Sequence, residues 1–284
     1  MKNNYYKVLL KKLARTPSFM VPCLILLSLF IFSFIVFMLY DNSLEANLNN
    51  SFLSPNLKYI FGTNEYGQNF FVVIFIGIFN TLILSALVSF INLILGGIVG
   101  IIWGHSAKMD AFMIILKSVL DNIPSIFFYI IIITSLGSGF LSLLLVILLF
   151  NWINTACLIR NNLIIIRNKD FNKMSKLLKT PGYKIAINNY LPSLLPIIFN
   201  SFAVSFPQLI SLEITLAYFG INLTNQQISL GNVLYSSISN NYYFSFPYLL
   251  VIPFIFLLVI NLCYFYIGKS ISSITETKEE KLHD

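Results

Sequence analysis

Residues 160–193, RNNLIIIRNKDFNKMSKLLKTPGYKIAINNYLPS, form the one long cationic stretch in a chain that is otherwise mostly apolar. Long apolar runs lie on both sides of it, and a run of charges is too costly to place inside a bilayer. The stretch must therefore lie at a membrane face, where it would present a short helix to a partner in the cytosol. Its charged residues are one acid, Asp170, and seven bases: Arg160, Arg167, Lys169, Lys173, Lys176, Lys179 and Lys184.

The composition excludes an ordinary soluble protein. Hydrophobic residues make up 57% of the 284 residues, charged residues only 10%, and the mean hydropathy is +0.81. Soluble domains carry about 25% charged residues. The net charge of +7 is concentrated at the amino terminus and in the stretch above, which indicates membrane topology and no nucleic-acid partner. The three cysteines lie far apart without paired spacing, so we expect no disulfide framework, metal site or cofactor.

An apolar helix of about 20 residues crosses a bilayer. Six stretches meet this requirement, and they predict an all-α integral membrane fold with six transmembrane helices. We take the first stretch as a retained span, because it is longer than the core of a signal peptide. In the second, Gly96, Gly100 and Gly104 recur every four residues, which predicts close approach of another helix. The predicted spans are 18–40, 77–103, 111–136, 139–159, 194–219 and 246–268.

The distribution of basic residues predicts the orientation. With the amino terminus inside, 16 of the 18 Lys and Arg residues lie on the cytosolic side. This arrangement places both termini, residues 1–17 and 271–284, in the cytosol of a multi-pass protein. The longer external loop is 41–76, and a second one, 221–245, carries no charged residue.

Three passages resemble the C-type permease subunit of the oligopeptide, dipeptide and nickel branch of bacterial ABC importers. They are F-G-T-N-E-Y-G-Q-N at 61–69, the spacing of the loop 160–193, and E-I-T-L-A-Y-F-G at 213–220 followed by L-G-N-V-L at 230–234. The resemblance implies a type I importer permease domain over 77–270 in a bacterial plasma membrane. The chain departs from the family pattern at Asn64, Gln68 and Asn69, which replace a charged trio, and at Leu230, which replaces Trp. In the loop, Lys173 stands where the pattern has Glu, and Lys179 where it has Gly. Met174 and Ser175 replace Ala-Ala, and Asn189 replaces Ile.

Residues from Asp170 to Lys179 have the pattern of an amphipathic helix. Asp170 is an acid suited to the positive end of the helix, and Pro181-Gly182 ends it. The resemblance implies that this is the coupling helix, between spans four and five, which docks on an ATPase subunit. The alternative is a basic helix that rests on anionic lipid headgroups. Its apolar stripe is Phe171, Met174, Leu177 and Leu178, and its basic face is Lys173, Lys176 and Lys179.

Five further residues are candidates for the translocation path or its gate. Lys117 and Asp121, four residues apart, can pair on one helix face, either as a gate or as a self-neutralising pair. Glu213 matches the family's Glu and would line a cavity or hold a neighbouring helix. Pro124 and Pro207 interrupt spans three and five, where they predict either a moving hinge or a static kink.

The chain has no nucleotide-binding glycine loop and no acid–base cluster, so we expect no enzymatic activity and no bound ATP of its own. By resemblance, its partners would be a homologous B-type permease, two cytosolic ATPases, an external substrate-binding lipoprotein and membrane lipid. The expected cargo is an oligopeptide or dipeptide, with nickel or a metal–chelator complex as the alternative. Two other classes stay open: a self-contained secondary transporter and a non-transporting membrane scaffold.

Overall fold

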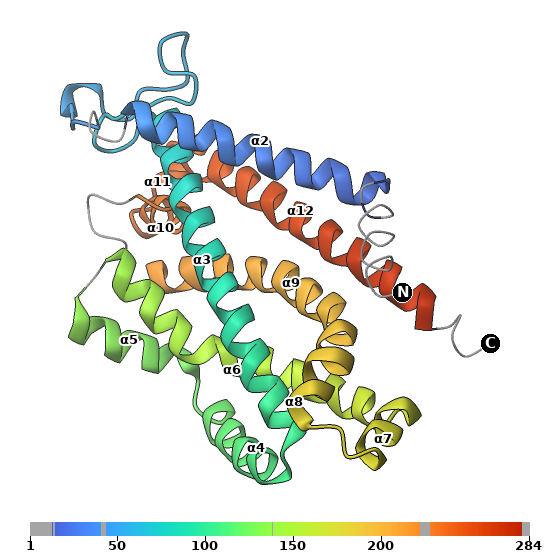
Figure 1. Cartoon of the computed structure of the whole chain (residues 1–284). Coiled ribbons are helices and arrows are strands. Elements are labelled where there is room, and N and C mark those ends of the chain that lie inside the picture. Colours follow the sequence, from blue (N-terminus) through green and yellow to red (C-terminus); the bar gives the residue numbers. More distant parts are fainter. Residues whose placement is uncertain (1–12, 14, 41–43, 138, 222–227, 280–284) are drawn as a thin grey trace.

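The regular elements of the described residues are all helices, joined by loops (Figure 1). The computed structural model describes residues 13, 15–40, 44–137, 139–221 and 228–279, with the backbone alone for Lys176 and residues 274–279. The longer helices are α2 (Pro17–Tyr40), α3 (Phe70–His105), α4 (Ala107–Asp121), α5 (Ser125–Leu136), α6 (Phe140–Arg167), α9 (Leu191–Tyr218) and α12 (Tyr248–Glu279). The shorter ones are η2 (Leu48–Asn50), α7 (Asp170–Leu177), α8 (Gly182–Ile185), η3 (Ala186–Tyr190), α10 (Leu230–Ser239) and α11 (Tyr242–Ser245).

The described residues contain five helices long and apolar enough to cross a membrane, and six spans if the bent pair α4 and α5 counts as one. This agrees with the predicted fold class. The third predicted span, 111–136, is wrong as a continuous helix, because α4 and α5 meet at an angle of 80°. Pro124 cannot donate to the preceding turn and restricts Ile123, so the helix ends at Asp121 and restarts at Ser125.

Two other predicted boundaries need correction. The second span begins at Phe70 rather than residue 77, because Asn69 caps it by accepting a hydrogen bond from the Phe71 amide. The preceding loop therefore ends at residue 69 and not at 76. The fourth span continues to Arg167, so Arg160 lies within α6 and outside the loop.

Helix α3 is the centre of the bundle and packs along α6. In the most apolar stretch of α3, 72% of the residues are buried. The corresponding share is 17% in α2 and in α12. The glycine stripe allows this contact, as predicted: a Cβ on Gly100 would lie 2.7 Å from the Ala156 carbonyl oxygen. Cβ atoms on Gly96 and Gly104 would also lie under 3 Å from α6 side chains.

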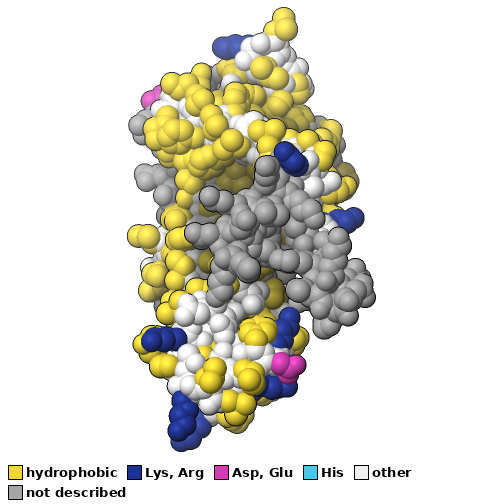
Figure 2. Space-filling model, turned by 45° about the vertical axis from the view of Figure 1, so that its right-hand side comes forward, with side chains coloured by type: hydrophobic (Ala, Val, Ile, Leu, Met, Phe, Trp, Pro, Cys, Tyr) yellow, Lys and Arg dark blue, Asp and Glu magenta, His cyan; other side chains and the backbone are white. Residues whose placement is uncertain are grey.

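Helices α2 and α12 lie side by side and present apolar side chains outward (Figure 1). Figure 2 shows mainly apolar side chains over the upper part of the molecule and several Lys and Arg side chains at the lower end, where α7 projects. The two ends of the bundle are thus different. One carries α7 and basic side chains, and the opposite one carries the loop 44–69 with α10 and α11.

Candidate functional site

Six of the ten residues predicted to couple the chain to an ATPase lie on α7, which projects from one end of the bundle (Figure 1). The other four follow it: Leu178, Lys179 and Pro181 lie in the turn after α7, and Gly182 begins α8. The apolar stripe faces outward. Phe171 and Met174 are 51% and 58% exposed, and Leu177 and Leu178 are 76% and 77% exposed. An amphipathic helix usually buries its apolar face. Here each of the four apolar side chains is more than half exposed, as a docking helix requires.

The opposite face of α7 is held by amide side chains. Asn172 is fully buried, and its amide donates to the Ile166 carbonyl at 2.7 Å. Asn189 donates from η3 to Asn172 at 2.9 Å and to the Ser175 hydroxyl at 3.2 Å. Sequence reasoning missed Asn172 and gave Asn189 no role. The only available signal was the position of Asn172 and Ser175 opposite the apolar stripe.

Lys179 takes the place of the family's glycine with a left-handed backbone. Its φ is +54°, a region that L-residues other than glycine avoid. The Thr180 amide donates to the Ser175 carbonyl at 3.1 Å, which completes a Schellman motif at the end of α7. The helix therefore ends at Leu177, before the end predicted at Pro181-Gly182. Gly182 begins the next helix, α8.

The charged residues of α7 lie at its surface. Asp170 is in the first turn, as predicted, and Lys173 Nζ lies 3.2 Å from its carboxylate. Both side chains are exposed, and an exposed pair of this kind contributes little to stability. Lys173 therefore remains free to meet a partner. The side chain of Lys176 lies outside the described residues.

Lys117 and Asp121 form the pair that their spacing predicts. Lys117 Nζ lies 2.7 Å from Asp121 Oδ2 and donates to Asn154 Oδ1 of α6 at 3.1 Å. Asp121 lines two cavities of about 340 Å³ each, one of which also borders Pro124. The pair therefore connects α4 to α6 directly beside the break between α4 and α5. This place suits either a gate or a static brace.

A second charged cluster was missed by sequence reasoning. Arg160 of α6 makes a bidentate contact with Asp110 of α4, from Nε to Oδ1 at 2.7 Å and from Nη2 to Oδ2 at 2.6 Å. The Trp103 indole of α3 donates to the same carboxylate at 2.7 Å. Three helices meet at this carboxylate. Because Asp110 and Arg160 lie 50 residues apart, no local spacing indicates the contact.

Glu213 is buried in α9, with 3% of its surface exposed. The Thr81 hydroxyl of α3 donates to Glu213 Oε1 at 3.3 Å and accepts from the Leu230 amide at 3.1 Å. The carboxyl group thus lies at the amino-terminal end of α10, where a carboxylate is favoured. This geometry matches the helix-holding alternative, since Glu213 joins three helices and does not line the cavity beside α10.

Pro207 lies inside α9, which continues through it. Its carbonyl accepts a hydrogen bond from the Ser211 hydroxyl at 2.8 Å, so this turn keeps a local contact near the proline. Figure 1 shows that α9 is curved, and a second proline, Pro196, lies in the same helix. Unlike Pro124, Pro207 therefore lies inside a helix without ending it.

At the opposite end of the bundle, neutral side chains replace the charged trio of the family's motif. Asn64 donates to Gln68 Oε1 at 2.8 Å and accepts from the Gln68 amide at 2.9 Å, which closes a tight loop. Gly67 sits at φ +71°, where a Cβ would overlap the Asn47 carbonyl. Asn69 caps α3. Amide hydrogen bonds therefore hold the loop together without charge.

These observations define a class: a multi-pass helical membrane protein with an amphipathic helix at one end whose apolar side chains face outward. Residues 93–273 match the model of the family described as binding-protein-dependent transport system inner membrane component. The chain belongs to this family, as the motifs predicted.

Two curated relatives illustrate the similarity. The oligopeptide transport system permease protein AmiD of Streptococcus pneumoniae is 30% identical over 283 residues, which cover 98% of this chain and 91% of AmiD. The dipeptide transport system permease protein DppC of Lactococcus lactis subsp. cremoris is 28% identical over 212 residues, which cover 74% of this chain and 61% of DppC. The similarity to AmiD thus spans nearly the whole of both chains.

Proposed function

We propose that this chain is a permease subunit of an ATP-driven importer of oligopeptides or dipeptides. The observation that carries the proposal is the mounting of α7: an amide-anchored inner face and four exposed apolar side chains, within the segment that matches the family. Such a face would dock into a groove of a separate ATPase subunit. Closure of the ATPases would then move α7 and, through α6 and α9, the bundle.

The remaining partners follow from membership of a binding-protein-dependent family. The chain would pair with a homologous B-type permease, two ATPases and an external substrate-binding lipoprotein, with ATP bound by the ATPases alone. The names of the two relatives, one an oligopeptide and the other a dipeptide permease, support peptides as cargo over nickel or a metal–chelator complex. The basic residues around α7 support a cytosolic position for this end and for both termini in a bacterial plasma membrane.

Uptake by the reconstituted complex tests the proposal. This chain is co-expressed with the proposed partner subunits from the same organism, purified and placed in liposomes. Entry of labelled dipeptides and oligopeptides is then compared with entry of radioactive nickel ions. We expect ATP-dependent peptide uptake that disappears when this subunit is omitted. Nickel uptake without peptide uptake would contradict the assigned cargo. Transport by this chain alone would contradict the ABC mechanism and favour a self-contained transporter.

A further inference from the structure

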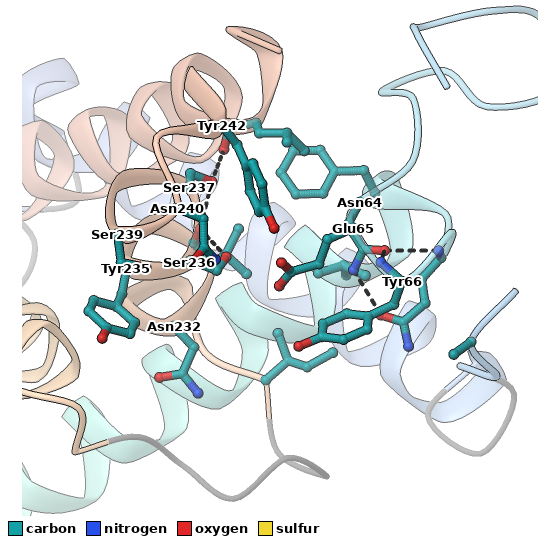
Figure 3. Close-up of a pocket in the computed structure, with 17 residues that line it drawn as sticks. Asn64, Glu65, Tyr66, Asn232, Tyr235, Ser236, Ser237, Ser239, Asn240 and Tyr242 are labelled. Carbon is teal, nitrogen blue, oxygen red and sulfur yellow. Dashed lines mark hydrogen bonds between the residues drawn. The ribbon is translucent and has the colours of Figure 1, made fainter. Parts of the chain in front are cut away.

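A pocket of about 520 Å³ lies at the end of the bundle opposite α7. One wall is the tight loop around residues 64–68, and the facing wall is α10 with Tyr242 of α11 (Figure 3). Volumes of this size are typical of small-molecule sites. The pocket is larger than a single inserted side chain would fill. Glu213, Lys117 and Asp121 are not among the residues that line it.

The α10 wall is a polar helix face. Asn232, Tyr235, Ser236 and Ser239 follow the i, i+3, i+4, i+7 spacing of one face and line the pocket. The other face is buried against the bundle through Leu230 and Leu234. In a chain with 57% hydrophobic residues, this face gathers amides and hydroxyls that can form hydrogen bonds with an occupant of the pocket. Such groups both donate and accept, which matches the amide groups of a peptide main chain.

Glu65 supplies a charge to this neutral lining. Among the described residues that line the pocket, it is the one with a charged side chain. Its position is set by the loop: the Asn64 side chain accepts from the Tyr66 amide at 3.1 Å, and the Ser51 hydroxyl donates to the Glu65 carbonyl at 2.9 Å. Its carboxylate points into the space between the two walls (Figure 3).

Two tyrosines and the local charge balance complete the environment. Tyr66 and Tyr242 flank Glu65 (Figure 3), and the Glu65 carboxylate raises the pKa of the Tyr66 phenol, which keeps it neutral. Aromatic rings next to a carboxylate form a favourable surround for a cation. Among the described residues of this end, 44–69 carry two acids and one base, and 228–247 carry no charge, so their net charge is negative.

We propose that this pocket is a subsite for a short peptide bearing a cationic group. Glu65 takes an ammonium or guanidinium group of the peptide, and the α10 face hydrogen-bonds its main chain. The assignment rests on the proposed function and deepens it, because it places substrate recognition in the permease itself. The volume and the amide-rich wall favour a peptide over a single basic side chain offered by a partner protein.

Charge-selective labelling tests the cation preference without any need for transport. A single cysteine is introduced as Ser236→Cys after Cys23, Cys157 and Cys263 are replaced by Ala, and the complex is purified in nanodiscs. Its reaction rate is measured with methanethiosulfonates that carry either a trimethylammonium or a sulfonate group. We expect the cationic reagent to react faster, and Glu65→Gln to lower the rate ratio by about tenfold, since a carboxylate attracts one reagent and repels the other.

The control is Glu45→Gln. Glu45 is exposed in the same loop but does not line the pocket, so its removal should leave the ratio nearly unchanged. An equal response to both substitutions, or no response to Glu65→Gln, would overturn the cation subsite. The labelling assay tests the subsite and the uptake assay tests the proposed function. Either assay can fail while the other succeeds, so the two failures are distinguishable.

Protection identifies the occupant. A lysine-containing tripeptide with a free amino terminus should slow labelling of Ser236→Cys at least several-fold, and Glu65→Gln should remove this protection. The N-acetylated tripeptide with norleucine in place of lysine should protect much less. Equal protection by both tripeptides would contradict the role of Glu65. Protection by the purified substrate-binding protein without ligand, and not by the tripeptide, would overturn the peptide assignment in favour of a docking contact.

Discussion

At the scale of single residues, Asn172 and Lys179 explain how α7 is presented. Asn172 is a buried amide whose hydrogen bonds fix the inner face of α7, and an unpartnered amide in its place would cost about 1–3 kcal/mol. Lys179 closes the helix in a conformation that suits glycine better. Lys179 therefore replaces the family's glycine but keeps the left-handed backbone conformation that glycine adopts most easily.

Lys179→Gly should stabilise the end of α7. Removing the side chain relieves about 1 kcal/mol of strain in the left-handed backbone. A smaller opposing effect comes from the greater conformational entropy that glycine gives the unfolded chain. We expect slower hydrogen exchange at the amides of Leu178 and Thr180. Lys184→Gly is the matched control, because Lys184 lies within α8 and glycine there should speed exchange instead. Faster exchange in Lys179→Gly would show that the lysine side chain, not its backbone, secures the turn.

Lys173→Glu, which restores the family's acid, should weaken assembly. Lys173 is exposed on α7, and a cation there implies an acidic or neutral surface on the ATPase partner. The substitution also places a second carboxylate beside Asp170, a smaller effect within the helix. Co-purification of ATPase subunits should fall, while Lys108→Glu, at an exposed position on α4, should leave it unchanged. Unchanged assembly in Lys173→Glu would mean that this side chain points to solvent in the complex.

At the scale of elements, the contact between α3 and α6 decides the packing of the core. Gly100→Ala should destabilise the protein by about 1–3 kcal/mol, because the new Cβ would meet the Ala156 carbonyl oxygen and the Ile159 side chain under 3 Å away. Gly97→Ala is the control, since nothing lies within 4 Å of its Cβ position. Thermal unfolding in detergent should separate the two variants. A Gly100→Ala protein as stable as Gly97→Ala would contradict the close α3–α6 contact.

The elements that sequence reasoning predicted are those with local signals. Hydropathy predicts the spans, and spacing along one helix predicts the Lys117–Asp121 pair and the stripe of α7. The contacts that it missed join distant segments: Asn189 with Asn172 across 17 residues, and Arg160 with Asp110 across 50. Pro124 predicts an interruption, but no local pattern contains the size of the bend, 80°, between α4, which packs on α3, and α5, which packs on α6.

At the scale of the whole molecule, topology determines which face meets which partner. Cysteines introduced singly at positions 50, 178 and 228 in the background without native cysteines should divide into two groups in intact cells. An impermeant reagent should label Asn50→Cys and Ile228→Cys, near the end opposite α7, and should leave Leu178→Cys unlabelled until the membrane is opened. Labelling of Leu178→Cys from outside would invert the proposed orientation.

The most direct test of the central claim is the coupling of α7 to ATP hydrolysis. Leu177→Asp combined with Leu178→Asp places two carboxylates on the face that would enter the ATPase groove, at a cost of several kcal/mol if they are buried there. Leu57→Asp, at a fully exposed leucine at the other end of the bundle, is the control. In the reconstituted complex, the double variant should fold and insert normally yet lose peptide uptake and ATPase co-purification, while the control retains both. Normal uptake by the double variant would show that α7 rests on lipid and does not couple the permease to an ATPase.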